Sequence, residues 1–124
     1  MRVFKNGWFG KFARKEAISD AALCEAVRRA EAGLIDADLG GGLLKQRVAR
    51  PGAGRSGGYR TILVFRSGDR AIFVFGFAKN NRADLTDEEE AAFKVAAKLV
   101  LRFTDAQLDE EVASGRLVEV ESDD

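Results

Sequence analysis

The sequence predicts an α+β fold: two N-terminal helices, then an antiparallel, twisted β-sheet, then C-terminal helices packed on that sheet. Apolar residues recur at helical spacing in residues 8–34 and again in residues 92–103. Between these segments, residues 43–78 alternate between polar and apolar positions or are rich in β-branched and aromatic residues, as strands are. A chain of 124 residues with 46% apolar residues suits one domain with its own core.

The N-terminal third is expected to be helical after a brief strand at residues 2–4. Trp8, Phe9 and Phe12 stand among lysines and indicate a short amphipathic helix with an aromatic face. A second helix follows a turn at residues 19–20, and Gly33 stands where this helix should end. Its apolar positions are Leu23, Val27, Ala30 and Leu34.

Three segments are expected to form the sheet. Alternation in residues 44–49 places Lys45 and Arg47 on one face and Gln46 on the other. Residues 59–66 and 70–78 pair naturally as a hairpin across residues 67–69. The connection at residues 50–58 is rich in glycine, and its G-x-G-x-x-G letters precede a strand and not a helix, so they do not predict a dinucleotide site.

The C-terminal third returns to helix. Thr86 and Glu89 have the spacing of a capping box, and Thr104 and Gln107 repeat it before a second, shorter helix. Residues 116–121 are expected to add a final strand. The apolar stripe expected to dock the long helix on the sheet consists of Ala92, Phe93, Ala96, Leu99, Val100 and Phe103.

A net charge of zero conceals an uneven distribution of charge. Residues 43–82 carry nine cations and one acid, a net charge of +8, whereas residues 83–124 have a net charge of −9. Because salt screens charges beyond about 8–10 Å, a partner senses mainly the local field. The basic segment therefore makes nucleic acid the first partner to consider.

Residue types that are rare or missing exclude several kinds of site. Cys24 is the only cysteine and histidine is absent, which excludes an intramolecular disulfide, thiolate or imidazole zinc sites, and Ser-His-Asp triads. Catalysis would have to use Lys, Arg, Tyr, Asp or Glu. The N-terminus lacks the apolar segment of a signal peptide and no stretch is long enough to span a bilayer, so we expect a cytoplasmic protein.

If the strands pair in order, six cations of the basic segment lie in one neighbourhood: Lys45, Arg47, Arg55, Arg60, Lys79 and Arg82. Clustering and partial burial favour the loss of a proton from lysine, so Lys45 or Lys79 is the candidate general base, while arginine stays charged and stabilises anions. This combination suits cleavage of an RNA phosphodiester. The alternative is a phosphate-binding face without chemistry. Tyr59, the only tyrosine, is expected in the core.

Two segments carry a resemblance to a known family. LLKQRVARPGAGRSGGYRTILVF (residues 43–65) and GDRAIFVFGFAKNNRADLT (residues 68–86), with weaker support from the N-terminal aromatic helix, resemble the RelE/HigB toxins of bacterial type II toxin–antitoxin systems, within the RelE/ParE superfamily. The resemblance implies a fold similar to that of microbial ribonucleases. It also implies one toxin domain over residues 1–124, with a C-terminal extension from about residue 104.

The resemblance further implies a ribosome-dependent mRNA endoribonuclease that inhibits translation and needs no metal or other cofactor. The catalytic residues it implies are Lys45, Arg47, Arg60 and Lys79. The RNA-binding residues it implies are Arg50, Arg55, Asn80 and Arg82. Some members use histidine or a C-terminal tyrosine for proton transfer. This chain has no equivalent, because it has no histidine and the position of that tyrosine is taken by Leu85 or Thr86. The proton donor is therefore not identified.

The implied partners are the ribosome, mRNA and a cognate antitoxin, commonly of the helix-turn-helix type; no membrane is implied. The antitoxin's acidic residues would complement the basic segment, and the chain's own acidic helix is another candidate to lie near it. Two other functions remain open: inhibition of DNA gyrase, as in ParE-like relatives, and RNA binding without catalysis.

Overall fold

The computed structural model of the protein describes residues 1–50 and 58–121. The α+β class predicted from the sequence is confirmed. Along the chain the elements are β1 (Arg2–Asn6), α1 (Gly7–Lys15), α2 (Asp20–Glu31), β2 (Ala37–Gly40), β3 (Leu43–Val48), β4 (Tyr59–Arg66), β5 (Arg70–Ala78), α3 (Asp87–Val100), α4 (Asp105–Ala113) and β6 (Leu117–Glu119).

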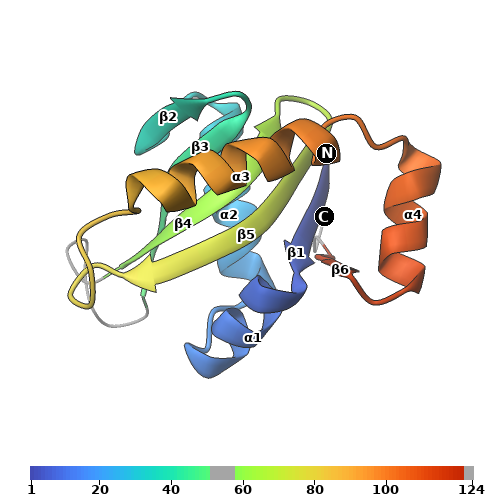
Figure 1. The fold of residues 1–124 in the computed structure, drawn as a ribbon. Helices are drawn as coiled ribbons and strands as arrows, with labels where there is room; N and C mark the ends of the chain where they lie inside the picture. The colour runs from blue at the N-terminus through green and yellow to red at the C-terminus, as the bar shows by residue number, and fades with distance from the viewer. Residues whose placement is uncertain (51–57, 122–124) are drawn as a thin grey trace.

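The strands form one mixed sheet in the order β2-β3-β4-β5-β1-β6 (Figure 1). Every neighbouring pair is antiparallel except β1 and β5, which are parallel. The sequence predicted an antiparallel sheet, and this one pairing differs. The chain passes from β1 to β5 through two helices and three strands, a crossover of the kind that parallel neighbours need, and not through a hairpin. Strand β2 was not predicted, since its four residues are too short to show a period.

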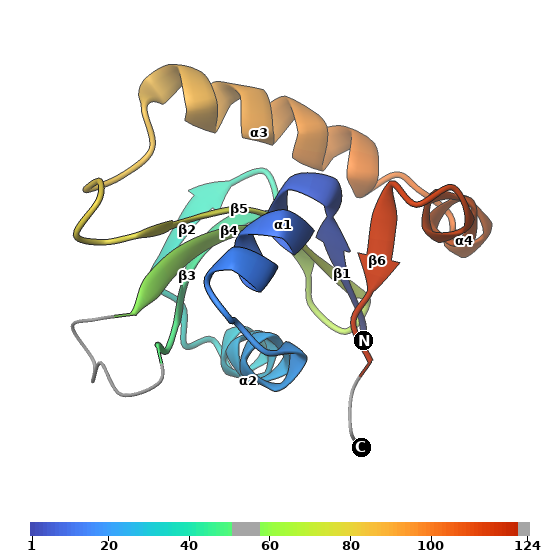
Figure 2. The ribbon, with the colours of Figure 1, turned by 90° about the horizontal axis from the view of Figure 1, so that it is seen from below.

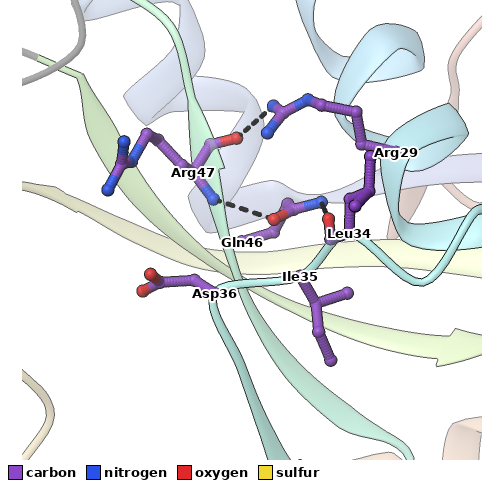
Figure 3. Close-up of a pocket in the computed structure, with 6 residues that line it drawn as sticks. All are labelled: Arg29, Leu34, Ile35, Asp36, Gln46 and Arg47. Atoms are coloured by element: carbon purple, nitrogen blue, oxygen red, sulfur yellow. Dashed lines mark hydrogen bonds between the residues drawn. The ribbon is translucent and has the colours of Figure 1, made fainter.

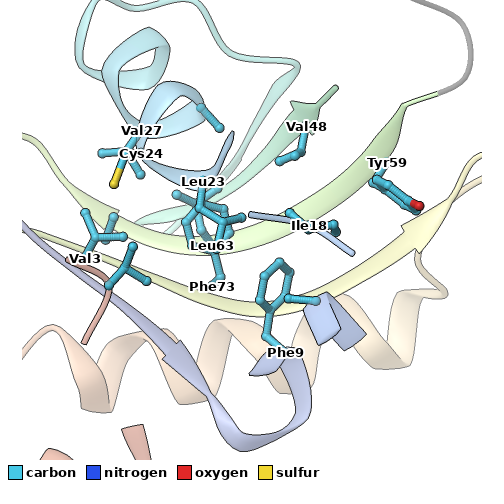
Figure 4. Packing of buried hydrophobic residues seen from close by; sticks show 14 of the residues in the cluster. Val3, Phe9, Ile18, Leu23, Cys24, Val27, Val48, Tyr59, Leu63 and Phe73 are labelled. Carbon is cyan, nitrogen blue, oxygen red and sulfur yellow. The ribbon is translucent and has the colours of Figure 1, made fainter. Parts of the chain in front are cut away.

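The sheet is covered on both faces, with α1 and α2 on one side and α3 on the other (Figures 1 and 2). The first core lies between the sheet and α1 and α2, where Phe9, Leu23, Leu63 and Phe73 have no exposed surface (Figure 4). The second core lies on the opposite face of the sheet, under α3. It includes Phe4, Leu43, Ile62, Ile72, Ala97 and Leu108. Burial on both faces explains why β4 and β5 read as nearly continuous apolar runs.

Helix α3 begins as predicted but docks through a different face. Thr86 and Glu89 form the capping box. Ala97 is fully buried and Phe93 packs on Phe75, whereas Leu99 is 61% exposed. The predicted stripe was wrong at Ala92, Ala96 and Leu99, which face solvent, because the small side chain of Ala97 is the one that lets the helix approach the sheet.

The last strand closes one edge of the sheet, as predicted for residues 116–121. Strand β6 pairs with β1, and Arg2 joins the two because its guanidinium contacts Glu119 at 3.0 Å and Asp109 of α4 at 2.7 Å. Within the described ranges, no helix combines the length and the apolar character that crossing a bilayer requires.

Candidate functional site

Three predicted catalytic residues lie on the sheet face that α3 also covers. Arg47 of β3 is directly opposite Arg60 of β4, and Lys45 is two residues from Arg47 on the same face. The alternation of β3 therefore places these cations as predicted. Like charges directly opposite each other on a sheet repel, so neighbouring carboxylates are needed to stabilise this arrangement.

Two aspartates that sequence reasoning missed supply these carboxylates. Oδ2 of Asp36 lies 3.2 Å from Nε of Arg60 and 4.0 Å from Nζ of Lys45. Oδ2 of Asp84 lies 3.1 Å from the same Nζ atom. Asp36 directly precedes β2 and donates its backbone N–H to Lys45, so its position depends on a strand that had no recognisable signal in the sequence.

Arg82 joins the same cluster from the connection between β5 and α3. Its guanidinium forms an ion pair with Glu89 of the α3 capping box and lies 5.6 Å from the ring centres of Phe75 and Phe77. Phe77 is opposite Arg60 in the β4–β5 pair, which places Arg82 beside the two arginines. The start of the acidic helix therefore does lie next to the basic site.

Two carboxylates of this cluster, Asp84 and Glu89, are stabilised in their charged form. The N–H of Leu85 and then the Lys45 ammonium keep the pKa of Asp84 below its ordinary value, against the opposing effect of burial. Hydrogen bonds from Arg82 and from the backbone of Thr86 do the same for the pKa of Glu89. Lys45 and Arg82 therefore each face a charged carboxylate near neutral pH.

The remaining predicted residues lie around this cluster or outside the described residues. Lys79 and Asn80 are exposed in the turn that follows β5, at the end of the sheet where Arg60 lies. Arg50 is exposed, and its guanidinium is 5.8 Å from the ring centre of Tyr59, which is buried as predicted. Arg55 falls in residues 51–57, outside the described residues.

Two cations of the basic segment lie at the other end of β4 and β5. Arg70, only 4% exposed, donates to the carbonyls of Val100 and Phe103 at 3.1 and 2.7 Å. Arg66 donates to the carbonyl of Leu101 at 2.7 Å. These arginines cap the C-terminus of α3, where the helix dipole favours positive charge. The segment with net charge +8 is thus divided between a surface site and a structural role.

A pocket of about 270 Å³ adjoins Arg47 at the edge of β3, next to the residues that precede β2 (Figure 3). Arg29 of α2 donates to the carbonyl of Arg47 at 2.5 Å, and the side chain of Gln46 accepts from the N–H of Arg47 at 3.2 Å. Strand β2 pairs with β3 only as far as Lys45, so these two side chains take the place of a strand partner for the N–H and the carbonyl of Arg47. They fix the backbone of Arg47 while leaving its guanidinium without an ion pair among the described residues.

The arrangement suits binding of a phosphate. Four cations and three carboxylates give the cluster a net charge of +1: Lys45, Arg47, Arg60 and Arg82 against Asp36, Asp84 and Glu89. Arginine binds phosphate through two parallel hydrogen bonds, so a bound phosphate can replace a carboxylate on Arg60. Arg60 has only 10% of its side chain exposed, and its Nε atom contacts Asp36, so a phosphate would have to displace this carboxylate to bind there.

The family comparison covers nearly the whole chain. A family model described as the RelE toxin of the RelE / RelB toxin-antitoxin system matches residues 1–120. No curated protein matches the sequence. The matched range includes every helix and strand from β1 to β6.

Proposed function

The chain belongs to the RelE toxin family and is the toxin of a toxin–antitoxin system, and from this premise we propose that it is a ribosome-dependent, metal-independent mRNA endoribonuclease that inhibits translation. The family implies an antitoxin partner. We also propose that this partner is of the helix-turn-helix type and that the toxin acts in the cytoplasm. The observation that supports the activity best is the Arg47–Arg60 pair, with Lys45 beside it on the same face.

The reaction needs two proton transfers around one phosphorus atom. The ribose 2′-oxygen attacks phosphorus, a base takes the 2′-proton, the bond from phosphorus to the 5′-oxygen breaks, and an acid protonates that oxygen. Negative charge grows on the non-bridging oxygens during this step. Arg47 and Arg60 stay charged and would hold these oxygens, and Arg55 would clamp the RNA backbone together with Arg50, Asn80 and Arg82.

Lys45 and Lys79 are the candidates for proton transfer. The Lys45 ammonium lies between two carboxylates, and an ammonium has protons to donate but no lone pair to accept one, which favours Lys45 as the acid. Lys79 is the other lysine of the site, exposed and without an ion pair in the described part of the chain, so we assign it the role of the base; to serve as one it must first lose its own proton. Both lie at the end of the sheet where the two arginines are.

Induced expression with a matched pair of variants tests this proposal. The wild-type chain should arrest growth and produce new 5′ ends on translated mRNAs, detected by primer extension soon after induction. Arg60→Ala should retain the circular dichroism spectrum of the wild type and lose both effects. Arg66→Ala removes an arginine from the other end of the same strand and should retain both effects.

Other outcomes would contradict the proposal in recognisable ways. Growth arrest with DNA damage and intact mRNA would indicate inhibition of gyrase. Salt-sensitive binding of RNA without cleavage, even on ribosomes, would indicate an RNA-binding module without catalysis. Full toxicity of a folded Arg60→Ala variant would show that the phosphate is held elsewhere.

A further inference from the structure

Helix α1 presents a tryptophan and three cations to solvent. Trp8 is 45% exposed, and Lys11, Arg14 and Lys15 are exposed as well; we call these four residues the α1 face. The first fifteen residues contain five cations and no acid. Arg2 and Lys5 are ion-paired, whereas the three cations of the α1 face have no ion pair within the described residues. This contrasts with the cations of the sheet, most of which contact carboxylates.

The helix geometry brings Trp8 and the lysines onto one side. At about 3.6 residues per turn, positions 8, 11 and 15 follow one another along the same side of the helix. Phe9 and Ala13 occupy the buried side and attach the helix to the core. With a rise of about 1.5 Å per residue, Trp8 and Lys15 are about 10 Å apart along the axis, so the α1 face is large enough for more than one nucleotide.

A row of aromatic side chains connects the α1 face to the site on the sheet. The ring of Trp8 lies 4.5 Å from that of Phe75, and Phe75 lies 6.4 Å from Phe77. Phe77 is opposite Arg60, and Arg82 covers both phenylalanines at 5.6 Å. Because Arg82 covers the two phenylalanines, an extended ligand bound at Arg60 would pass over the Arg82 guanidinium to reach Trp8.

Trp8 is also held in place before any ligand binds. Asn6 accepts a hydrogen bond from the N–H of Phe9 at 2.8 Å and donates to the carbonyl of Val74 at 3.2 Å, which fixes the start of α1 against β5. The Trp8 ring stacks on Phe12 at 5.3 Å with 16° between their planes. A ring already fixed by its neighbours loses little conformational freedom when a base stacks on it.

We propose that the α1 face binds single-stranded RNA, with one base stacked on Trp8 and the flanking phosphates on Lys11, Arg14 and Lys15. This inference rests on the proposed function, because it extends the RNA site by the nucleotides beyond the scissile phosphate. Aromatic rings among cations are the usual means of binding single strands without sequence preference. The first fifteen residues contain no acid, so the α1 face favours a polyanion as its partner over a protein surface that carries both acids and bases.

Trp8 is the only tryptophan, so its fluorescence reports directly on this contact. The probe is a short 2′-O-methyl oligoribonucleotide, which binds but lacks the nucleophile for cleavage. Saturating amounts should quench the fluorescence of the full-length protein. An abasic oligonucleotide of the same length keeps the phosphates but not the bases, and it should bind without comparable quenching.

Variants provide the second measurement, using anisotropy of a labelled probe. Trp8→Leu retains an apolar side chain and should weaken binding about tenfold, whereas Trp8→Phe should weaken it less. Lys11→Gln with Lys15→Gln should reduce the slope of log affinity against log salt by about 1.4, since each lost phosphate contact on a single strand contributes about 0.7.

Each result either supports or overturns the inference. Wild-type affinity in Trp8→Leu, or unchanged fluorescence of the protein saturated with probe, would overturn it. Quenching by the antitoxin alone, with none by RNA, would assign the α1 face to a protein partner and also overturn it. Normal mRNA cleavage by Trp8→Leu, together with no quenching of the wild-type protein by RNA, would overturn this inference only. Quenching of the wild-type protein without any cleavage on ribosomes would contradict the nuclease and leave the inference standing.

Discussion

The Nζ atom of Lys45 lies 3.1 Å from Oδ2 of Asp84, which follows it by 39 positions in the chain. This ion pair connects β3 to the segment that leads from β5 into α3. Asp36 approaches the same ammonium at 4.0 Å and contacts Arg60 more closely. The cations of the site are therefore held in place by carboxylates, and RNA would have to compete with these for the cations.

Asp84→Asn is expected to reduce stability only where Asp84 is ionised. The pKa of Asp84 is lower in the folded protein than its ordinary value of 3.8. The stability that Asp84 contributes is therefore present above about pH 4 and is lost as the pH falls through the pKa of the folded protein. The side chain is 56% exposed, so the effect at neutral pH should be at most about 1 kcal/mol. Urea unfolding at neutral pH and at about pH 3 measures it. Asp38→Asn, which removes a carboxylate without an ion pair in the described part, should show no such pH-dependent difference.

Asp36→Asn should strengthen the binding of RNA. The change removes a carboxylate that competes with phosphate for Arg60 and Lys45. One more cation available to phosphate should steepen the slope of log affinity against log salt by about 0.7. Titration of a non-cleavable oligoribonucleotide at several salt concentrations measures both quantities. Asp38→Asn makes the same change of charge nearby in β2; an equal gain there would indicate a general effect of net charge.

Arg70→Ala should destabilise the protein far more than Arg66→Ala. Arg70 is almost fully buried and satisfies two carbonyls at the end of α3, so its loss should lower the free energy of unfolding by about 3 kcal/mol. Arg66 has 49% of its side chain exposed, and water can replace its hydrogen bonds at a cost of about 1 kcal/mol or less. Urea unfolding followed by circular dichroism compares the two. Equal effects would show that Arg70 does not support α3 as described.

Gly76→Ala should loosen the attachment of α1 to the sheet. A Cβ atom at this position would lie 2.7 Å from Cε2 of Phe12 and 3.2 Å from Cε2 of Phe9, so the helix must shift, at a cost of about 1–3 kcal/mol. Gly7→Ala is the matched control, since a Cβ there meets nothing within 4 Å. Thermal unfolding measures the difference. A wild-type melting temperature for Gly76→Ala would mean that α1 can move away without loss of packing.

Features that depend on nearby residues were predictable from the sequence. The capping boxes at Thr86 and Thr104, the hairpin between β4 and β5, and the common face of Lys45 and Arg47 were all predicted and are all present. Each rests on residues a few positions apart, where spacing alone determines which groups meet. The residue pattern of the basic segment likewise indicated the family that the comparison shows.

Only the tertiary structure decided which charges meet. The acids and cations of the site come from positions 36, 45, 60, 82, 84 and 89, and they are neighbours because β2, β3 and the start of α3 converge at one end of the sheet. The same topology assigns Arg66 and Arg70 to the end of α3 and turns Leu99 to solvent. A Coulomb interaction depends on distance in space, and residue spacing along the chain carries no signal for pairs this far apart.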